Sequence, residues 1–246
     1  MVLYNIKNKK IVWNRGRCRG LKDSQERIGG ILTDIKKLLK IKKKIKILEI
    51  GCGYGKALLE LRKLFGDKVE IHGINLEKRW DTKLSKKFGI SEKIFTSKDI
   101  EENLPKIHIL DAGKKMPFKD KSFDYIYSWA SVQYVLDKAK LLEETNRMLT
   151  EKGIARIEMQ EVKKETYAVE YRNLFEIRKD NKIINFKTYI KKFKNIKTKQ
   201  SKFQPWSYII MKKAKKLDLK LKRIKTIDLH AINLKWWGNK VVYLVR

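Results

Sequence analysis

A glycine-rich loop, Gly51-Cys52-Gly53-Tyr54-Gly55, stands between a short apolar run and a segment with helical spacing. The run is KIKILEI at residues 44–50, and leucines recur at helical spacing within residues 57–65. Glycine adopts positive φ readily and lets a ligand approach the backbone. The order of strand, glycine turn and helix predicts a nucleoside-binding loop at the carboxyl end of a strand. A purely structural turn is the alternative.

The spacing of the glycines argues against a dinucleotide. A dinucleotide loop has the form G-x-G-x-x-G, in which the third glycine lets the helix pack closely on the strand. Here the third glycine comes one residue early, and Lys56 stands where that pattern requires glycine. The loop therefore favours a different nucleoside ligand.

Hydrophobic periodicity predicts alternating strands and helices along most of the chain. We expect a helix over 22–41 with Ser24 as its N-cap, and further helices over 57–65, 77–88 and 136–149. Further strands are expected over 69–76, 106–111, 123–129 and 153–160. This alternation is typical of a mostly parallel sheet with helices on both faces. Beyond residue 160 we expect a helix over 206–217 and strands over 219–229 and 240–246.

The chain is strongly basic, with a formal net charge of +32, and residues 161–246 carry 24 basic against 7 acidic side chains. Such a charge suits an anionic partner such as RNA, but lysine dominates over arginine, which also fits a solvated basic surface. Aromatic residues in this part are interleaved with lysines: Phe186, Tyr189, Phe193, Phe203, Trp206 and Tyr208. They are either stacking platforms for single-stranded nucleic acid or side chains that pack this segment onto the sheet.

The sequence contains no apolar leader and no run long enough to span a membrane, so we expect a cytoplasmic protein. Its two cysteines, Cys18 and Cys52, provide neither a disulfide framework nor a zinc site. The three histidines are too scattered for a recognisable metal pattern, so no metal is expected.

Two stretches resemble the class I methyltransferases, in particular their ubiquinone/menaquinone-methyltransferase-like branch. They are ILEIGCGYG, and DAGKKMPFKDKSFDYIYSWASVQYV followed by LLEETNRMLTEKGIARIEM, which together span about residues 45–160. The resemblance implies a Rossmann-like doubly wound α/β fold with a mostly parallel seven-stranded sheet and an antiparallel last strand. A single domain, 1–246, would comprise an N-terminal helical segment (1–44), a cofactor-binding core (45–160), a basic insertion (161–205) and a closing helix and strands (206–246).

The same resemblance implies that the chain uses S-adenosylmethionine. Asp111 would accept from the adenine amino group, with Ala112 beside the ring, and Ser128 would lie near the methionyl moiety. The remaining implied cofactor contacts are Glu49, Gly51, Cys52, Gly53, Gly55, Asn75 and Leu76. Asn75 departs from the family, which commonly has an acid there to bind both ribose hydroxyls; Glu77 is a substitute two residues later.

Methyl transfer depends mainly on alignment, so it demands no fixed catalytic residue. Trp129, Gln133 and Tyr134 follow the fourth strand and are candidates for the acceptor pocket, although core packing is as good an explanation for the aromatics. Arg17, in a cluster with Arg15 and Arg19, is expected to contact the cofactor carboxylate or an anionic acceptor.

Absent signatures narrow the acceptor. The chain lacks the [DNS]-P-P-[YFW] pattern of enzymes that methylate base amines, and neither cysteine follows a proline as a cytosine-C5 nucleophile would. A nitrogen, oxygen or sulfur acceptor remains open. Three functions are compatible with the sequence: a methyltransferase acting on RNA, a methyltransferase acting on a small molecule, and a nucleic-acid-binding module whose activity has lapsed.

Overall fold

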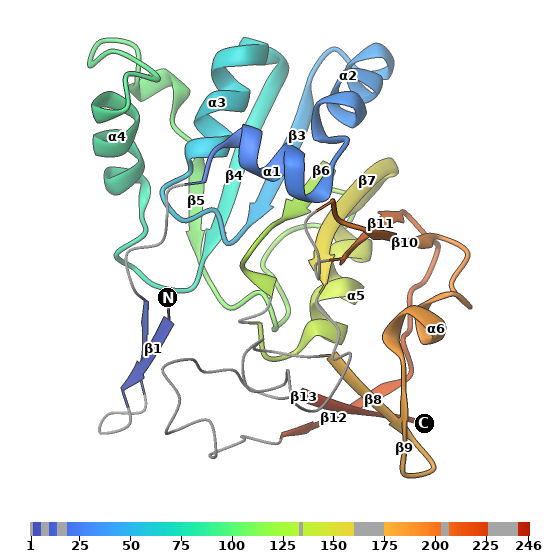
Figure 1. The fold of residues 1–246 in the computed structure, drawn as a ribbon. Helices are drawn as coiled ribbons and strands as arrows, with labels where there is room; N and C mark the ends of the chain where they lie inside the picture. The colour runs from blue at the N-terminus through green and yellow to red at the C-terminus, as the bar shows by residue number, and fades with distance from the viewer. Residues whose placement is uncertain are drawn as a thin grey trace.

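The computed structural model describes residues 2–5, 10–13, 19–132, 135–159, 175–202, 207–225 and 241–246. A seven-stranded sheet forms its centre (Figure 1), with the strand order β10-β11-β7-β6-β3-β4-β5. The strands are β3 (Ile45–Ile50), β4 (Val69–Asn75), β5 (Lys106–Ile109), β6 (Phe123–Ser128), β7 (Leu149–Met159), β10 (Ile196–Gln200) and β11 (Ser207–Lys212).

Five neighbouring strands, from β7 to β5, are parallel, whereas β11 pairs antiparallel with β7 and β10 pairs antiparallel with β11. The predicted α/β class and mostly parallel seven-stranded sheet are therefore confirmed. The first five strands fall where the periodicity predicts them. Only β7 begins clearly earlier, at Leu149, because its first residue pairs with Phe123 across a break in register.

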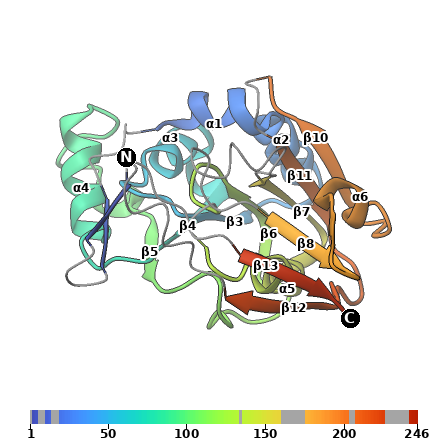
Figure 2. The same ribbon diagram turned by 60° about the horizontal axis from the view of Figure 1, so that its bottom comes forward.

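Helices cover both faces of the sheet, and each face has its own core (Figure 2). On one face, α1 (Leu21–Ile28), α2 (Ile31–Ile41) and α3 (Lys56–Phe65) pack on Ile47 and Tyr127. On the other face, α5 (Lys138–Met148) packs on Leu48 and Ile126. Neighbouring residues of a strand thus serve opposite cores, as alternation along a strand requires. Two short 3₁₀ helices, Gly66–Lys68 and Glu101–Asn103, complete this part of the chain.

The helix predicted over 22–41 is in fact two helices. Gly29 and Gly30 both adopt positive φ, +59° and +62°, which ends α1 and starts α2 in a new direction. Gln25 caps the start of α2, because its Oε1 accepts from the amide of Leu32 at 3.1 Å. Ser24 is not the N-cap of α1: Gly20 occupies that position, and the Ser24 hydroxyl donates to the Gly20 carbonyl from inside the helix. The paired glycines were the overlooked signal.

The helix predicted over 77–88 begins later than expected. It is α4 (Thr82–Ser91), and Asp81 caps it by accepting from the amide of Leu84 at 3.0 Å. Glu77 therefore lies in the turn before the helix, where its carboxylate pairs with Arg79 at 2.6 Å.

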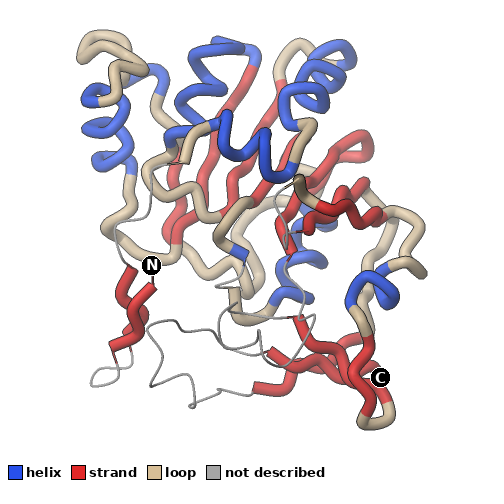
Figure 3. The backbone as a smooth tube through the Cα atoms, in the orientation of Figure 1, coloured by secondary structure: helices blue, strands red, loops and turns tan. Residues whose placement is uncertain are grey.

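The helix predicted over 206–217 is wrong, because the strand β11 occupies residues 207–212. Ser207, Ile209 and Met211 are buried in alternation, and the strand pairs on both sides. The expected strands over 219–229 and 240–246 are present as β12 (Leu221–Lys225) and β13 (Val241–Val245). They belong, however, to a second sheet of order β12-β13-β8-β9, seen near the C-terminus in Figure 3.

The predicted insertion, 161–205, contributes β8 (Phe175–Lys179), β9 (Lys182–Ile184), α6 (Phe186–Ile190) and β10. The N-terminal segment, predicted as helical, also contains an antiparallel hairpin of β1 (Val2–Asn5) and β2 (Lys10–Trp13). Within the described part of the chain, no helix combines the length and apolar character that a membrane span needs.

Candidate active site at the carboxyl ends of the strands

The glycine loop lies after β3, in the centre of the sheet between β4 and β6. Gly51, Gly53 and Gly55 have φ angles of +75°, +54° and +74°. The amides of Gly51 and Cys52 both donate to the carbonyl of Ile74, at 2.7 and 3.2 Å, so the loop is held against the end of β4. Other residues rarely adopt these backbone angles, which explains the three glycines.

One side of this loop is packed and another is open. A Cβ at Gly51 would lie 2.1 Å from the Cβ of Ser131, whereas a Cβ at Gly53 would meet nothing within 4 Å. Ser128 and Ser131 brace the packed side, because both hydroxyls donate to the carbonyl of Ile50, at 2.8 and 2.6 Å. The backbone around Gly53 is therefore the part of the loop that a ligand can approach.

Glu49, at the end of β3, is a buried carboxyl with an incomplete set of hydrogen bonds. The residue is 7% exposed, and its Oε2 has no hydrogen-bond partner in the described structure. Burial raises the pKa of Glu49 to about 8; the neighbouring Glu60 adds to this shift, and the Tyr127 hydroxyl opposes it. Burial also raises the pKa of the adjacent Cys52 thiol. An unpaired buried carboxyl is costly, so Glu49 marks a place where a bound group can supply a donor.

Asn75, at the end of β4, holds the glycine loop in place. Its Oδ1 accepts from the amide of Gly53 at 2.8 Å, and its Nδ2 donates to the carbonyls of Gly53 (3.0 Å) and Trp80 (2.7 Å). Both amide hydrogens are therefore engaged, and only one lone pair of Oδ1 is left for a ribose hydroxyl. Leu76, the next residue, is 52% exposed, which is unusual for a leucine at a strand end.

Asp111 follows β5 beside the end of β4, because the amide of Leu110 donates to the carbonyl of Asn75 at 2.9 Å. One carboxylate oxygen of Asp111 accepts from the amide of Gly113 at 2.8 Å, which shapes the turn. Ala112 is buried. The structure thus brings Glu49, the glycine loop, Asn75 and Asp111 to one edge of the sheet, as the sequence predicts.

Trp129 follows Ser128 and lies among charged side chains from α1, from the residues just before it and from β7. The guanidinium of Arg19 stacks 4.0 Å from its ring centroid, and that of Arg27 lies at 5.4 Å. The carboxylate of Glu158, which is 5% exposed, accepts from the amide of Ala130 at 2.5 Å. Burial raises the pKa of Glu158 to about 7, against the opposing effects of that amide and of the two arginines.

Three predicted site residues, Arg17, Gln133 and Tyr134, lie outside the described residues. Arg19, the described residue of that arginine cluster, lies against Trp129. Sequence reasoning missed Arg27 and Glu158, since each sits within an ordinary helix or strand pattern. Among the described residues, no cluster of three or more His, Cys, Asp or Glu is arranged to hold a metal.

The aromatic residues of the basic C-terminal part mostly pack inward. Phe186 and Tyr189 are 2% and 6% exposed, and Phe193 packs against the same core. These three pack against the core, and the burial of Phe186 and Tyr189 leaves those two unavailable as stacking platforms. Tyr208 is half-buried on β11, while Phe203 and Trp206 lie outside the described residues.

Comparisons with known proteins find a methyltransferase-domain model and relatives named as methyltransferases. A family model described as "Methyltransferase domain" matches residues 48–157. The chain is similar to the sarcosine/dimethylglycine N-methyltransferase of Aphanothece halophytica, with 26% identity over 110 residues, 44% of this chain and 35% of that protein. It is also similar to a sterol 4-C-methyltransferase of Caenorhabditis elegans, with 28% identity over 132 residues, 52% of this chain and 35% of that protein.

Among solved structures, phosphoethanolamine N-methyltransferase 2 of Haemonchus contortus, in complex with phosphomonomethylethanolamine and S-adenosylhomocysteine, has a TM-score of 0.50 and 18% identity. The match covers 77% of this chain and 54% of that one, and it is a likeness of fold. The chain spans about a third of the length of the two curated relatives.

Proposed function

Because a methyltransferase-domain model matches residues 48–157, we propose that this chain binds S-adenosylmethionine at the glycine loop and methylates a small molecule. The observation that carries the proposal is the buried Oε2 of Glu49, which lacks a hydrogen-bond partner in the described structure and stands two residues before the glycine loop. The cofactor has a cationic ammonium group that suits such a carboxyl.

The remaining residues at this edge fit the other parts of the cofactor. Asp111 has a carboxylate oxygen to accept from the adenine amino group, and the exposed Leu76 offers an apolar surface for the ring. Asn75 would contact the ribose through the remaining lone pair of Oδ1 while it continues to hold Gly53. Gly51, Cys52, Gly53 and Gly55 would form the backbone cradle, with Ala112 and Ser128 at its sides.

The bound cofactor would supply a methyl group attached to a positively charged sulfur. A lone pair of the acceptor would bond to the methyl carbon as the carbon–sulfur bond breaks, which leaves a neutral thioether. The protein's part is to align the acceptor and exclude water. Trp129 stands directly after Ser128, at the carboxyl end of β6, and would form a side wall of the acceptor pocket. The acceptor atom can be nitrogen, oxygen or sulfur.

A small acceptor is better supported than RNA. The curated relatives reported above are named for sarcosine and dimethylglycine and for sterols, none of which is a nucleic acid. The burial of Phe186 and Tyr189 also removes two of the side chains that motivated the RNA hypothesis. The finer assignment to the ubiquinone/menaquinone branch, and that to a cytoplasmic enzyme, stay predictions.

Calorimetric titration with S-adenosylmethionine and S-adenosylhomocysteine tests the donor. We expect saturable binding of both ligands. No detectable binding would contradict the enzyme proposal and favour a methyltransferase scaffold that has lost its activity. Incubation with methyl-labelled cofactor and a cell extract, fractionated into RNA, protein and small molecules, tests the acceptor. Label in the small-molecule fraction is expected, and label confined to RNA would overturn that part.

A further inference from the structure

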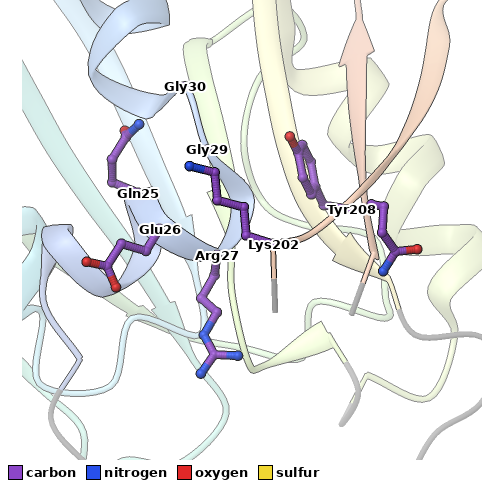
Figure 4. Close-up of a pocket in the computed structure, with 8 residues that line it drawn as sticks. Gln25, Glu26, Arg27, Gly29, Gly30, Lys202 and Tyr208 are labelled. Carbon is purple, nitrogen blue, oxygen red and sulfur yellow. The ribbon is translucent and has the colours of Figure 1, made fainter. Parts of the chain in front are cut away.

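A separate cavity of about 630 Å³ lies between α1 and the strands β10 and β11 (Figure 4). Its walls include Gln25 and Arg27 on α1, Gly29 at the helix break, and Lys202 and Tyr208 across from them. Cavities of about 300–1,000 Å³ are typical of small-molecule sites. The cavity therefore has the right size for a metabolite-sized ligand.

A rigid framework shapes this cavity. Gly30 lies directly on Arg156, since a Cβ at Gly30 would come within 2.3 Å of the guanidinium. Arg156 in turn donates from Nε to Asp34 at 2.6 Å and from a terminal nitrogen to the carbonyl of Ile28 at 3.1 Å. This buried ion pair fixes the helix break against β7. Tyr208 is fixed from the other side, because it pairs with Glu158 in the sheet.

The charged side chains that line the cavity are mostly cationic. Arg27 and Lys202 line it, against the single acid Glu26. An arginine presents a planar fork that matches a carboxylate or phosphate group, and a lysine adds a flexible point charge. Gln25 and Tyr208 add a polar group and an aromatic wall. This combination favours a small molecule with one anionic group.

Arg27 connects the cavity to the reaction centre. Its guanidinium lies 5.4 Å from the ring centroid of Trp129, which directly follows the serine that braces the glycine loop. Buried Glu158 lies close enough to Arg19 and Arg27 for both to oppose the rise in its pKa. A ligand held at Arg27 is therefore adjacent to Trp129, the residue that would line the acceptor pocket.

We propose that this cavity binds the methyl acceptor through a carboxylate or phosphate group, which Arg27 and Lys202 hold while the rest of the acceptor extends toward Trp129. This inference rests on the proposed function for the identity of the ligand as an acceptor. The anion site itself is testable without any methyl transfer.

The experiment titrates the full chain with inorganic phosphate and, separately, with acetate, at constant ionic strength set with chloride. Constant ionic strength removes general screening of the basic surface. Tryptophan fluorescence reports binding, because an anion on Arg27 alters its stacking on Trp129, and a Trp129→Phe variant identifies that signal. We expect saturable binding, and the anion with the higher affinity identifies the preferred group.

Two variants, Arg27→Gln and Lys202→Gln, should each weaken anion binding by about 10-fold or more, because a hydrogen bond to a charged group is lost. Lys44→Gln is the matched control: it removes the same charge from an exposed position before β3, and anion affinity should be unchanged. Lys202 is exposed, so that variant remains informative if the loss of Arg27 perturbs folding.

Titration of the same variants with S-adenosylmethionine separates the two proposals, since cofactor affinity should stay within about twofold of that of the parent chain. If the parent chain binds the cofactor but shows no saturable anion binding, the cavity inference fails and the enzyme proposal survives. Anion binding that responds equally to Lys44→Gln and Lys202→Gln would also overturn it. If the parent chain binds anions but not the cofactor, the anion site is supported, and its proposed role in methylation is contradicted.

Discussion

Two groups of polar side chains lie in the same sheet, yet their hydrogen bonding differs. At the carboxyl end of β3, Glu49 is buried with an oxygen that has no partner in the described structure. Nearer the amino end of β4, the polar groups satisfy one another: His108 lies 3.1 Å from His72, which lies 3.0 Å from Glu70, and Lys106 donates to the same carboxylate at 2.9 Å.

The histidine group is a chain of neutral and charged partners. With His72 donating to Glu70, its other ring nitrogen accepts from His108, and both rings remain neutral. Burial lowers the pKa of both histidines. Burial opposes the shift of Glu70, but the hydrogen bonds from Lys106 and His72 lower its pKa to about 2. A satisfied cluster of this kind stabilises the fold, whereas the unsatisfied carboxyl of Glu49 is suited to a ligand.

The largest expected effect is at the loop next to Glu49. Gly51→Ala would place a Cβ 2.1 Å from that of Ser131 at a φ of +75°. We expect a loss of about 3 kcal/mol in the free energy of unfolding, from backbone strain and overpacking, and a loss of cofactor affinity of about 100-fold or more. Urea unfolding and calorimetry measure the two effects.

Gly66→Ala is the matched control for that substitution. Gly66 has a φ of +57° and a ψ of −140°, a region that glycine alone occupies readily, but open space around its missing Cβ, so only backbone strain of about 1–3 kcal/mol applies. Its cofactor affinity should equal that of the parent chain. Equal losses of affinity in the two variants would mean that the contact between Gly51 and Ser131 does not matter.

Glu49→Gln should weaken cofactor binding by about 10- to 100-fold near pH 8 without lowering stability, because the charge is lost while the shape is kept. The pKa of Glu49 is about 8, so below that pH the free protein carries a proton that binding of a cation must displace. Affinity of the parent chain should therefore rise toward pH 8, by at most about tenfold per pH unit, and the glutamine variant should lack this rise.

Calorimetry in two buffers of different ionisation enthalpy counts the released proton directly. A pH-independent affinity in the parent chain would show that Glu49 does not pair with the cofactor's ammonium. If Glu49→Gln lowers the free energy of unfolding by as much as it lowers the free energy of cofactor binding, Glu49 has a structural role like that of His72.

Asn75→Asp introduces the acid that the family commonly has at this position for binding the ribose. Here a second carboxylate oxygen would face the carbonyls of Gly53 and Trp80, which now accept from Nδ2. We expect a loss of about 1–3 kcal/mol in the free energy of unfolding and about tenfold weaker cofactor binding, because a buried repulsion replaces two hydrogen bonds. Tighter binding would show that ribose contact outweighs the support of the loop.

The smallest effect is expected in the histidine group. His108→Phe should lower the free energy of unfolding by about 1 kcal/mol near pH 7.5, since His72 loses a donor, and leave cofactor affinity unchanged. Below pH 6.5 the histidines are protonated in the unfolded chain but stay neutral in the folded one, because folding lowers their pKa. The free energy of unfolding therefore decreases as the pH is lowered, by less than about 1.4 kcal/mol per pH unit for each histidine. In urea unfolding at several pH values, the free energy of unfolding of His108→Phe should depend less steeply on pH than that of the parent chain. A change in its cofactor affinity would contradict a purely structural role for the histidine group.

The central part of the fold was predictable because periodicity and burial coincide there. The strands from β3 to β7 are apolar runs that end at polar or glycine residues, and the resemblance of their ends to a family indicated Glu49 and Asp111. The strand β11 was mistaken for a helix, because its run of Tyr, Ile, Ile and Met fits both periods. Pairing with β7 and β10 decides its structure, and that pairing leaves no local signal.

The site was predictable only where local motifs define it. The role of Asn75 depends on the carbonyl of Trp80 in an irregular turn, which no spacing rule anticipates. Arg27 and Lys202 line one cavity from two distant segments, and Glu158 lies near Arg27 from a third. Each looks ordinary in its own stretch, so only the folded chain brings them together.

The contact between Gly30 and Arg156 constrains how this sequence can vary. Any side chain at position 30 collides with the guanidinium of Arg156. A shorter residue at position 156 would leave the buried carboxylate of Asp34 without the hydrogen bond that it now accepts from Arg156. These three positions cannot change one at a time, because each single replacement breaks a contact that the other two depend on. We therefore expect related chains to keep Gly30, Asp34 and Arg156 together or to lose all three together, although the first and the last are 126 positions apart in the sequence.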